Sequence, residues 1–247
     1  MSKTEKWLSK SINNILLSYP RSGNTWVRYC IEYITGKPTN GACGSSIANS
    51  IPHHIKPICC LTGMGINCDQ DPIAHKFHKI NFPVDENDVG LIVVVRNYKE
   101  SVIRHKCYDN RSGSFGIDNW KLKFKDAVLG ESDKVDYVKI LLTYDKWKGR
   151  KILIYYEDII SNPASEIGRL AKFFGVDFDA DKFMKDIDLH REKSVSVYKS
   201  WSFSSTKGKN DKFHSEKFDK NDLLWMDKTV ESRNSYIFEE YLKRYKE

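Results

Sequence analysis

The sequence predicts an α/β fold built around a mostly parallel sheet. Three short apolar runs, at 15–17, 91–95 and 152–156, are each followed by a segment whose apolar residues recur at helical spacing. The run at 91–95 is continuous and mainly β-branched, which is typical of a strand buried on both faces of a parallel sheet. The 247 residues suffice for one large α/β domain but not for two, so we expect a single domain over residues 1–247.

Composition and charge favour a small anionic partner. The chain has 40 Lys and Arg and 33 Asp and Glu, a formal net charge of +7, but no sustained basic tract or nucleic-acid module. No apolar run approaches the length of a membrane span, and residues 1–10 lack the apolar core of a signal peptide. We therefore expect a cytoplasmic protein that binds neither nucleic acid nor membrane, with its six cysteines reduced.

The first predicted strand runs into a helix through a loop of small residues. After Pro20 the chain passes Ser22 and Gly23, and a helix is expected until the stop signal at 36–38. Such a junction directs backbone N–H groups and the positive end of a helix dipole at one spot, so it favours a bound phosphate or sulfate. Arg21 and Thr25 add a cation and a hydroxyl. The alternative is an ordinary strand-to-helix turn, and the spacing is not that of a Walker A loop.

The next stretch, to about residue 71, is rich in loop-forming residues and is typical of a lid or a substrate wall. It contains side chains that could bind zinc, as does the segment just beyond it. These are His53, His54, Cys59, Cys60, Cys68 and His75. No C-x-x-C or H-x-x-x-H pair occurs among them, so buried thiols and surface imidazoles are the favoured interpretation and no metal site is predicted.

Two predicted strands end in polar side chains. Residues 73–80 form the first, on which Lys76 and His78 would share one face and could act as an acid/base pair, although a lone His is more often structural. The second, 91–95, ends in Arg96 and is followed by a helical segment. Ligands of open α/β sheets bind at the carboxyl ends of strands, which makes Arg96 a candidate anion ligand.

The remainder of the chain predicts three further helices and a strand. Residues 106–134 are polar and dotted with aromatic side chains, as expected of a segment that covers an acceptor. Helices are expected at 137–147, at 162–174 and over most of 222–245, with a buried strand at 152–156. Between the last two helices, Lys207 and Gly208 form a pair that could approach a phosphate closely.

In order along the chain, these segments resemble the motifs of sulfotransferases that use 3′-phosphoadenosine 5′-phosphosulfate. Residues 19–26 are similar to the family's loop Tyr-Pro-Lys-Ser-Gly-Thr-Thr-Trp, with Arg21 replacing its Lys and Asn24 replacing a Thr. Lys76 and His78 match its Lys-x-His motif. Further matches to its 3′-phosphate motif, its adenine pocket and its closing Arg-Lys-Gly loop are Arg96, Asn97, Lys99, Tyr156, Lys207 and Gly208.

The resemblance implies a three-layer α/β/α fold with a P-loop-like phosphosulfate-binding loop and no metal. It implies His78 as general base, with Lys76 and Arg21 as catalytic cations. The implied cofactor contacts are Arg21, Ser22, Gly23, Asn24, Thr25, Trp26, Arg96, Arg104, Tyr156, Lys207 and Gly208. Arg104 stands where the family has a Ser, and Ser101 lies one helical turn earlier, so either could contact the 3′-phosphate.

The predicted function is sulfuryl transfer to a hydroxyl or amine of a small molecule, with adenosine 3′,5′-bisphosphate as the other product. Two alternatives are a P-loop nucleotide kinase and a non-catalytic module that binds polyanions. The kinase would need Mg²⁺ and a Lys followed by Ser or Thr in the loop, which the sequence lacks, while the second is suggested by the net charge alone. A homodimer is also possible on this interpretation, although the dimer motif of the family is not evident.

Overall fold

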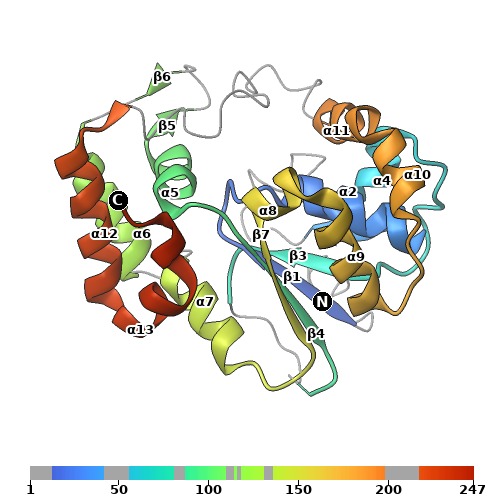
Figure 1. Cartoon of the computed structure of the whole chain (residues 1–247), viewed down its shortest axis with the longest axis horizontal. Coiled ribbons are helices and arrows are strands. Elements are labelled where there is room, and N and C mark those ends of the chain that lie inside the picture. The colour runs from blue at the N-terminus through green and yellow to red at the C-terminus, as the bar shows by residue number, and fades with distance from the viewer. Residues whose placement is uncertain are drawn as a thin grey trace, which may run out of the picture.

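The centre of the molecule is a five-stranded sheet in which all neighbouring strands are parallel, in the order β2-β3-β1-β4-β7 (Figure 1). The computed structural model describes residues 13–41, 56–80, 87–109, 114–115, 118–130, 136–197 and 217–247. The strands are β1 (Asn14–Ser18), β2 (Thr39–Gly41), β3 (Ala74–Phe77), β4 (Gly90–Val95) and β7 (Lys151–Tyr155). A separate two-stranded antiparallel pair joins β5 (Tyr108–Asp109) to β6 (Ser114–Phe115).

The strand order places β1 at the point where the chain changes direction across the sheet. After β1 the chain forms β2 and β3 on one side, and then crosses to form β4 on the other side of β1. Leu17 of β1 therefore has Phe77 of β3 on one flank and Val93 of β4 on the other. In open α/β sheets, ligands bind outside the carboxyl ends of the strands at such a reversal.

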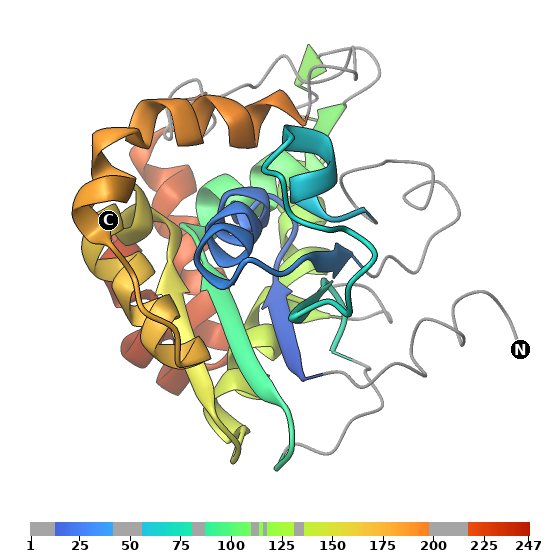
Figure 2. The same cartoon turned by 90° about the vertical axis from the view of Figure 1, so that its right-hand side faces the viewer.

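Alternate residues of the strands face two separate cores, which gives three layers (Figures 1 and 2). Ile15 and Leu17 face the core formed with α5 (Tyr98–Lys106), α6 (Trp120–Leu129), α7 (Tyr137–Lys146) and α12 (Lys220–Arg233). Leu16 faces the core formed with α2 (Asn24–Thr35), α4 (Ile58–Thr62), α8 (Tyr156–Ser161), α9 (Pro163–Phe174) and α10 (Ala180–Lys185). The predicted α/β fold with helices on both faces of the sheet is confirmed.

The remaining described helical segments complete the two outer layers. Next to α10 lies α11 (Ile187–Ser196). After α12 come α13 (Ser235–Ile237), a π-helical turn (Phe238–Leu242) and a 3-10 turn (Lys243–Tyr245). Among the described residues, no helix combines the length and the apolar character that crossing a bilayer requires.

The predicted stop signals of two helices are confirmed. Gly36 follows α2 in a left-handed conformation (φ 60°), and its N–H group donates to Glu32 O. Gly175 ends α9 in the same way (φ 67°), and Pro163 opens that helix. The predicted strand at 73–80 is shorter than expected, since β3 ends at Phe77 and His78 follows it.

The segment 106–134 contains α6, a helix that the sequence analysis did not predict. Trp120 and Phe124 of α6 are buried, and both lie against Trp225 of α12. These two aromatic side chains therefore pack into the core, and the expectation that the segment 106–134 covers an acceptor stays a prediction.

The expectation that all cysteines are reduced is contradicted at one pair. Cys60 of α4 and Cys68 form a disulfide. The chain turns back between them through Gly63 and Gly65, which both have positive φ, so the two residues meet. Among the described cysteines, Cys30, Cys59 and Cys107 are free and buried.

Candidate functional site

The loop between β1 and α2 has the conformation of an anion-binding turn. Arg21 (φ 70°) and Gly23 (φ 85°) are both left-handed, and α2 begins at Asn24 without a side-chain cap. The first N–H groups of this twelve-residue helix therefore point out of its positive end. Ser22 Oγ is buried and has no hydrogen-bond partner within the described part of the chain. A buried hydroxyl in that state, beside helix N–H groups, fits an oxyanion ligand.

The ends of β1, β4 and β7 converge on this loop. Tyr156, the first residue after β7, lies so close to Gly23 that a Cβ atom there would be 2.1 Å from the Tyr156 ring. The guanidinium carbon of Arg96, just beyond β4, is 4.5 Å from the centre of the same ring. Arg96 Nη1 also donates to Arg21 O over 3.3 Å. The structure thus brings Arg21, Gly23, Arg96 and Tyr156 together.

His78 lies beside the same loop, at the end of β3. Its Nδ1 is 2.7 Å from the carbonyl oxygen of Ser18, the last residue of β1. Because a carbonyl only accepts, Nδ1 carries the proton, and Nε2 is the ring nitrogen that can accept one. Lys76 lies on β3 in register with Leu16 of β1 and is almost fully buried.

Trp26 and Arg104, both expected as cofactor ligands, contact other protein side chains in the structure. Trp26 is buried and stacks on Tyr29, with 5.7 Å between ring centres, so it packs mainly within the core. Arg104 Nε is 3.2 Å from a carboxylate oxygen of Glu100, one helical turn earlier. Ser101 Oγ is buried and has no hydrogen-bond partner among the described residues. Lys207 and Gly208 lie outside the described residues.

Lys99, which matched the 3′-phosphate motif, does not point at the loop. Its Nζ is 2.6 Å from Tyr245 O and 2.8 Å from a carboxylate oxygen of Asp227. Its side chain is 1% exposed, so its ammonium group interacts with other parts of the protein rather than with solvent.

Sequence reasoning missed the residues that support the site from behind. Tyr137 donates its O–H to Arg96 O. Glu157 accepts the N–H of Asn97 over 2.9 Å. His105 Nδ1 lies 2.9 Å from the hydroxyl of Tyr19. Desolvation by the surrounding side chains, followed by the charges of Lys106 and Arg21, lowers the pKa of His105. These contacts join residues far apart in the sequence, so no local motif could have found them.

Three cysteine sulfur atoms that could bind a metal lie close together, away from the loop between β1 and α2. In the described part of the chain, the Sγ atoms of Cys59, Cys60 and Cys68 lie within 4.8 Å of one another. Two of them form the disulfide. The N–H group of Cys59 donates to Glu32, which lies near the C-terminal end of α2, whereas Gly23 precedes the N-terminal end. The cysteine cluster is therefore not part of the loop site.

Comparisons with known proteins identify the family and the fold of the chain. A model of the family described as "Sulfotransferase domain" matches residues 12–240. The chain is 24% identical over 209 residues to sulfotransferase 1 family member D1 of Mus musculus, covering 78% of this chain and 69% of that protein. It is also 24% identical over 185 residues to flavonol 4′-sulfotransferase of Flaveria chlorifolia, covering 66% of this chain but only 55% of that one.

A solved structure shares the fold. Mouse sulfotransferase SULT7A1, whose crystal structure is complexed with PAP, superposes with a TM-score of 0.60 at 18% sequence identity. The superposition covers 93% of this chain and 89% of that one.

Proposed function

Because the chain belongs to the sulfotransferase domain family, we propose that it moves a sulfuryl group from 3′-phosphoadenosine 5′-phosphosulfate to a hydroxyl or amine of a small-molecule acceptor. The observation that carries the proposal is the meeting of two strand ends. Arg96 after β4 contacts the backbone of Arg21 in the loop after β1, with 3.3 Å between Nη1 and the carbonyl oxygen. One nucleotide with phosphates at its 5′ and 3′ ends could span these two cationic positions.

The residues present fit such a cofactor. The buried Ser22 hydroxyl lacks a hydrogen-bond partner among the described residues. Only a glycine fits at position 23, because the Cβ atom of any other residue would clash with the Tyr156 ring. Ser22, Gly23, Asn24 and Thr25 would hold the 5′ side through N–H groups and hydroxyls. The ribose phosphate would be bound by Arg96 with Arg104 or Ser101, together with Lys207 and Gly208, while Tyr156 and Trp26 would flank the adenine.

The cofactor, when bound, supplies the sulfuryl group and leaves as adenosine 3′,5′-bisphosphate. His78 removes the acceptor's proton at Nε2, while the Ser18 carbonyl holds Nδ1–H and so fixes the tautomer. Arg21 and Lys76 place positive charge where negative charge develops on the departing phosphate. Arg21 acts as a fixed charge, because a guanidinium does not give up its proton near neutral pH. No metal is required in this account.

The acceptor is proposed to be a small hydroxyl- or amine-bearing molecule. One of the relatives is a flavonol sulfotransferase, which favours a phenol as the first class to test. The cytoplasmic location, the absence of nucleic acid and membrane partners, and the possible homodimer stay predictions.

The test is a mass-spectrometric screen of phenols, alcohols and amines, incubated with the protein and 3′-phosphoadenosine 5′-phosphosulfate in EDTA. We expect at least one acceptor to gain the mass of an SO₃ group, in amounts that depend on the protein. Phosphorylation of acceptors in the presence of ATP and Mg²⁺ would favour the kinase alternative. Binding of heparin or DNA without transfer to any acceptor would favour the polyanion-binding module.

A further inference from the structure

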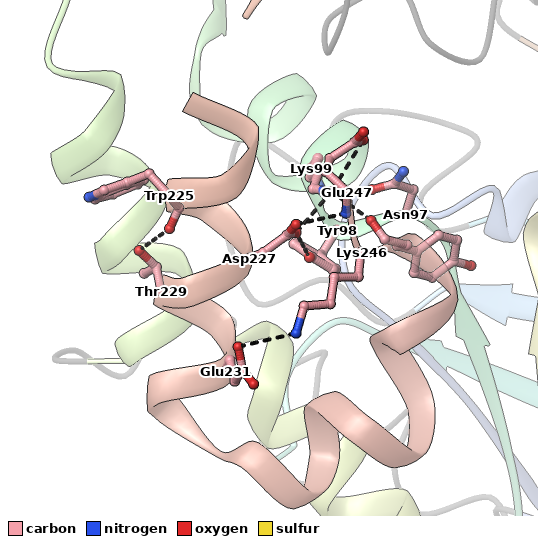
Figure 3. Close-up of polar contacts among 10 residues, drawn as sticks. Asn97, Tyr98, Lys99, Trp225, Asp227, Thr229, Glu231, Lys246 and Glu247 are labelled. Carbon is pink, nitrogen blue, oxygen red and sulfur yellow. Dashed lines mark hydrogen bonds and ion pairs between the residues drawn. The ribbon is translucent and has the colours of Figure 1, made fainter. Parts of the chain in front are cut away.

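A buried ion pair links α5 to α12 behind the proposed 3′-phosphate side of the site. Lys99 Nζ and Asp227 Oδ1 are 2.8 Å apart, with side chains 1% and 2% exposed (Figure 3). Tyr98 donates its O–H to the same Asp227, and Glu247 N–H donates to its other oxygen over 2.9 Å. Burial, followed by the hydrogen bond to Asp227, raises the pKa of Tyr98, so its hydroxyl stays protonated and donates. The buried charges of Lys99 and Asp227 therefore have partners inside the protein.

The ion pair holds residues 245–247, which end the last helical turn and follow it. Lys99 Nζ also donates to Tyr245 O over 2.6 Å, and the N–H of Glu247 is held by Asp227. Residues 245–247 are thereby held against the N-terminal end of α5 (Figure 3). The ring of Tyr245 then reaches Glu157, to whose Oε2 its hydroxyl donates over 2.6 Å. Burial and the neighbouring Glu157 charge raise the pKa of Tyr245, so this hydroxyl also stays protonated.

Glu157 connects Tyr245 to the peptide group between Arg96 and Asn97. Its Oε1 accepts the N–H of Asn97 over 2.9 Å, while Tyr137 donates to the carbonyl oxygen of Arg96. The two polar atoms of one peptide group are thus held by side chains from two other elements. The orientation of this peptide helps to set the direction in which the Arg96 side chain leaves the backbone. Arg96 in turn lies over Tyr156 and contacts the loop at Arg21.

We infer that Glu157 and Tyr245, anchored by the Lys99–Asp227 pair, are positioning residues that aim Arg96 at the 3′-phosphate. They would thereby determine the preference for a 3′-phosphorylated nucleotide. The inference rests on the proposed function, since it assigns the discrimination between nucleotides with and without that phosphate to residues that act through Arg96. It gives the Lys of the motif a different role from phosphate contact, because its ammonium group is bound within the protein.

The experiment compares the dissociation constants of adenosine 3′,5′-bisphosphate and 5′-AMP by calorimetry. The ratio of the two constants reports how much the 3′-phosphate contributes to binding. The Arg96→Ala variant shows how far this ratio falls when the side chain proposed to bind the 3′-phosphate is absent. Tyr245→Phe keeps the ring but removes the hydroxyl, and Glu157→Ala removes the carboxylate. Tyr241→Phe is the matched control, since Tyr241 donates to Asp145 over 2.7 Å in the same part of the chain without touching Glu157 or Arg96.

We expect Glu157→Ala and Tyr245→Phe to weaken bisphosphate binding about tenfold, the effect of losing a hydrogen bond to a charged group, and to leave AMP binding nearly unchanged. In the Arg96→Ala background, Tyr245→Phe should then have no further effect on the ratio. Tyr241→Phe should preserve both constants.

Three outcomes are decisive. If Tyr245→Phe weakens both nucleotides equally, or lowers only the melting temperature, the network is merely structural and the inference is wrong. The same holds if Arg96→Ala abolishes discrimination while Tyr245→Phe and Glu157→Ala retain it. If the unmodified protein does not distinguish the two nucleotides, the proposed function itself fails. Should Glu157→Ala not fold, Tyr245→Phe decides alone, since it retains the packing of the ring.

Discussion

At the scale of single residues, His78 carries the proposed proton transfer. His78→Ala should reduce turnover by about 10²–10⁴-fold, the usual contribution of a general base. Binding of adenosine 3′,5′-bisphosphate should persist, because His78 is proposed to act on the acceptor, with its Nδ1 held by the carbonyl oxygen of Ser18. Turnover is measured with an acceptor from the screen, and binding by calorimetry. Lost binding together with intact residual turnover would refute the role of general base.

Gly23 is the residue at which backbone conformation and close approach coincide. Gly23→Ala adds a side chain at φ +85° and a Cβ atom 2.1 Å from the Tyr156 ring, so Tyr156 must move. Gly36→Ala is the matched control, because Gly36 at the other end of α2 also has positive φ (+60°) but no atom within 4 Å of a new Cβ.

Both variants should lose about 1–2 kcal/mol of unfolding free energy through left-handed strain. Only Gly23→Ala should weaken bisphosphate binding strongly, as measured by calorimetry. Equal binding losses in the two variants would show that Tyr156 and the loop are not coupled at the site.

Motifs in the sequence located the residues of the site better than their partners. Gly23, His78 and Arg96 could be named because each lies on or just after a predicted strand within a short pattern. Glu157 and Tyr245 could not, since their contacts to the site join positions 60 and 88 residues apart. The roles of all these residues stay predictions until a ligand is bound.

At the scale of elements, Glu32 ties α2 to β2 and α4. Its buried carboxylate accepts N–H groups from Thr39 and Ile58, each over 2.9 Å, and from Cys59. Glu32→Ala would leave these donors unpaired. We expect a loss of about 3 kcal/mol or more in unfolding free energy, since each unsatisfied buried group costs about 1–3 kcal/mol.

Urea denaturation measures this loss. The control is Glu231→Ala, because Glu231 is a partly exposed residue of α12 whose ion pair with Lys246 spans 3.8 Å. It should barely shift the midpoint. A similar effect of the two substitutions would contradict the anchoring role of Glu32.

The elements that sequence patterns missed have weak or misleading periodicity. Residues 120–125 alternate Trp, Leu and Phe with Lys, which is not a helical pattern, yet this segment begins α6. Packing of Trp120 and Phe124 on Trp225 determines the structure there, and that contact joins α6 to α12. Where an apolar face is followed by a glycine stop, the prediction was closer: α9 was predicted almost to the residue, and α2 ends at its predicted stop.

At the scale of the whole molecule, buried histidines make stability depend on pH. Burial lowers the pKa of His75 and of His190, so both are neutral when folded but bind protons more readily when unfolded. The unfolded chain then binds more protons below the ordinary histidine pKa of about 6.5, so the free energy of unfolding falls as pH falls below that value.

Urea denaturation at pH 7.5 and at pH 5.5 should show this loss, which is at most about 1.4 kcal/mol per histidine for each pH unit. His190→Phe, which keeps a ring against Phe183, should reduce the slope. A stability that rises toward pH 5.5 would contradict the assignment.

The sulfotransferase family and the α/β fold predicted from sequence are confirmed, whereas the strand order could not be predicted. Parallel strands are joined by long crossovers, so nothing local specifies that β1 lies between β3 and β4. The Cys60–Cys68 disulfide was missed for a related reason, since it depends on the turn that follows α4. The single-domain organisation stays a prediction.

The central claim is that one nucleotide is bound at both of its phosphates by residues that follow the neighbouring strands β1 and β4. Calorimetric titration with adenosine 3′,5′-bisphosphate in EDTA tests it most directly, beside a titration with ATP and Mg²⁺. We predict tight binding of the bisphosphate without metal, weak binding of ATP, and loss of bisphosphate binding in Arg96→Ala. Tight binding of ATP that requires Mg²⁺, with no response to the bisphosphate, would contradict the account.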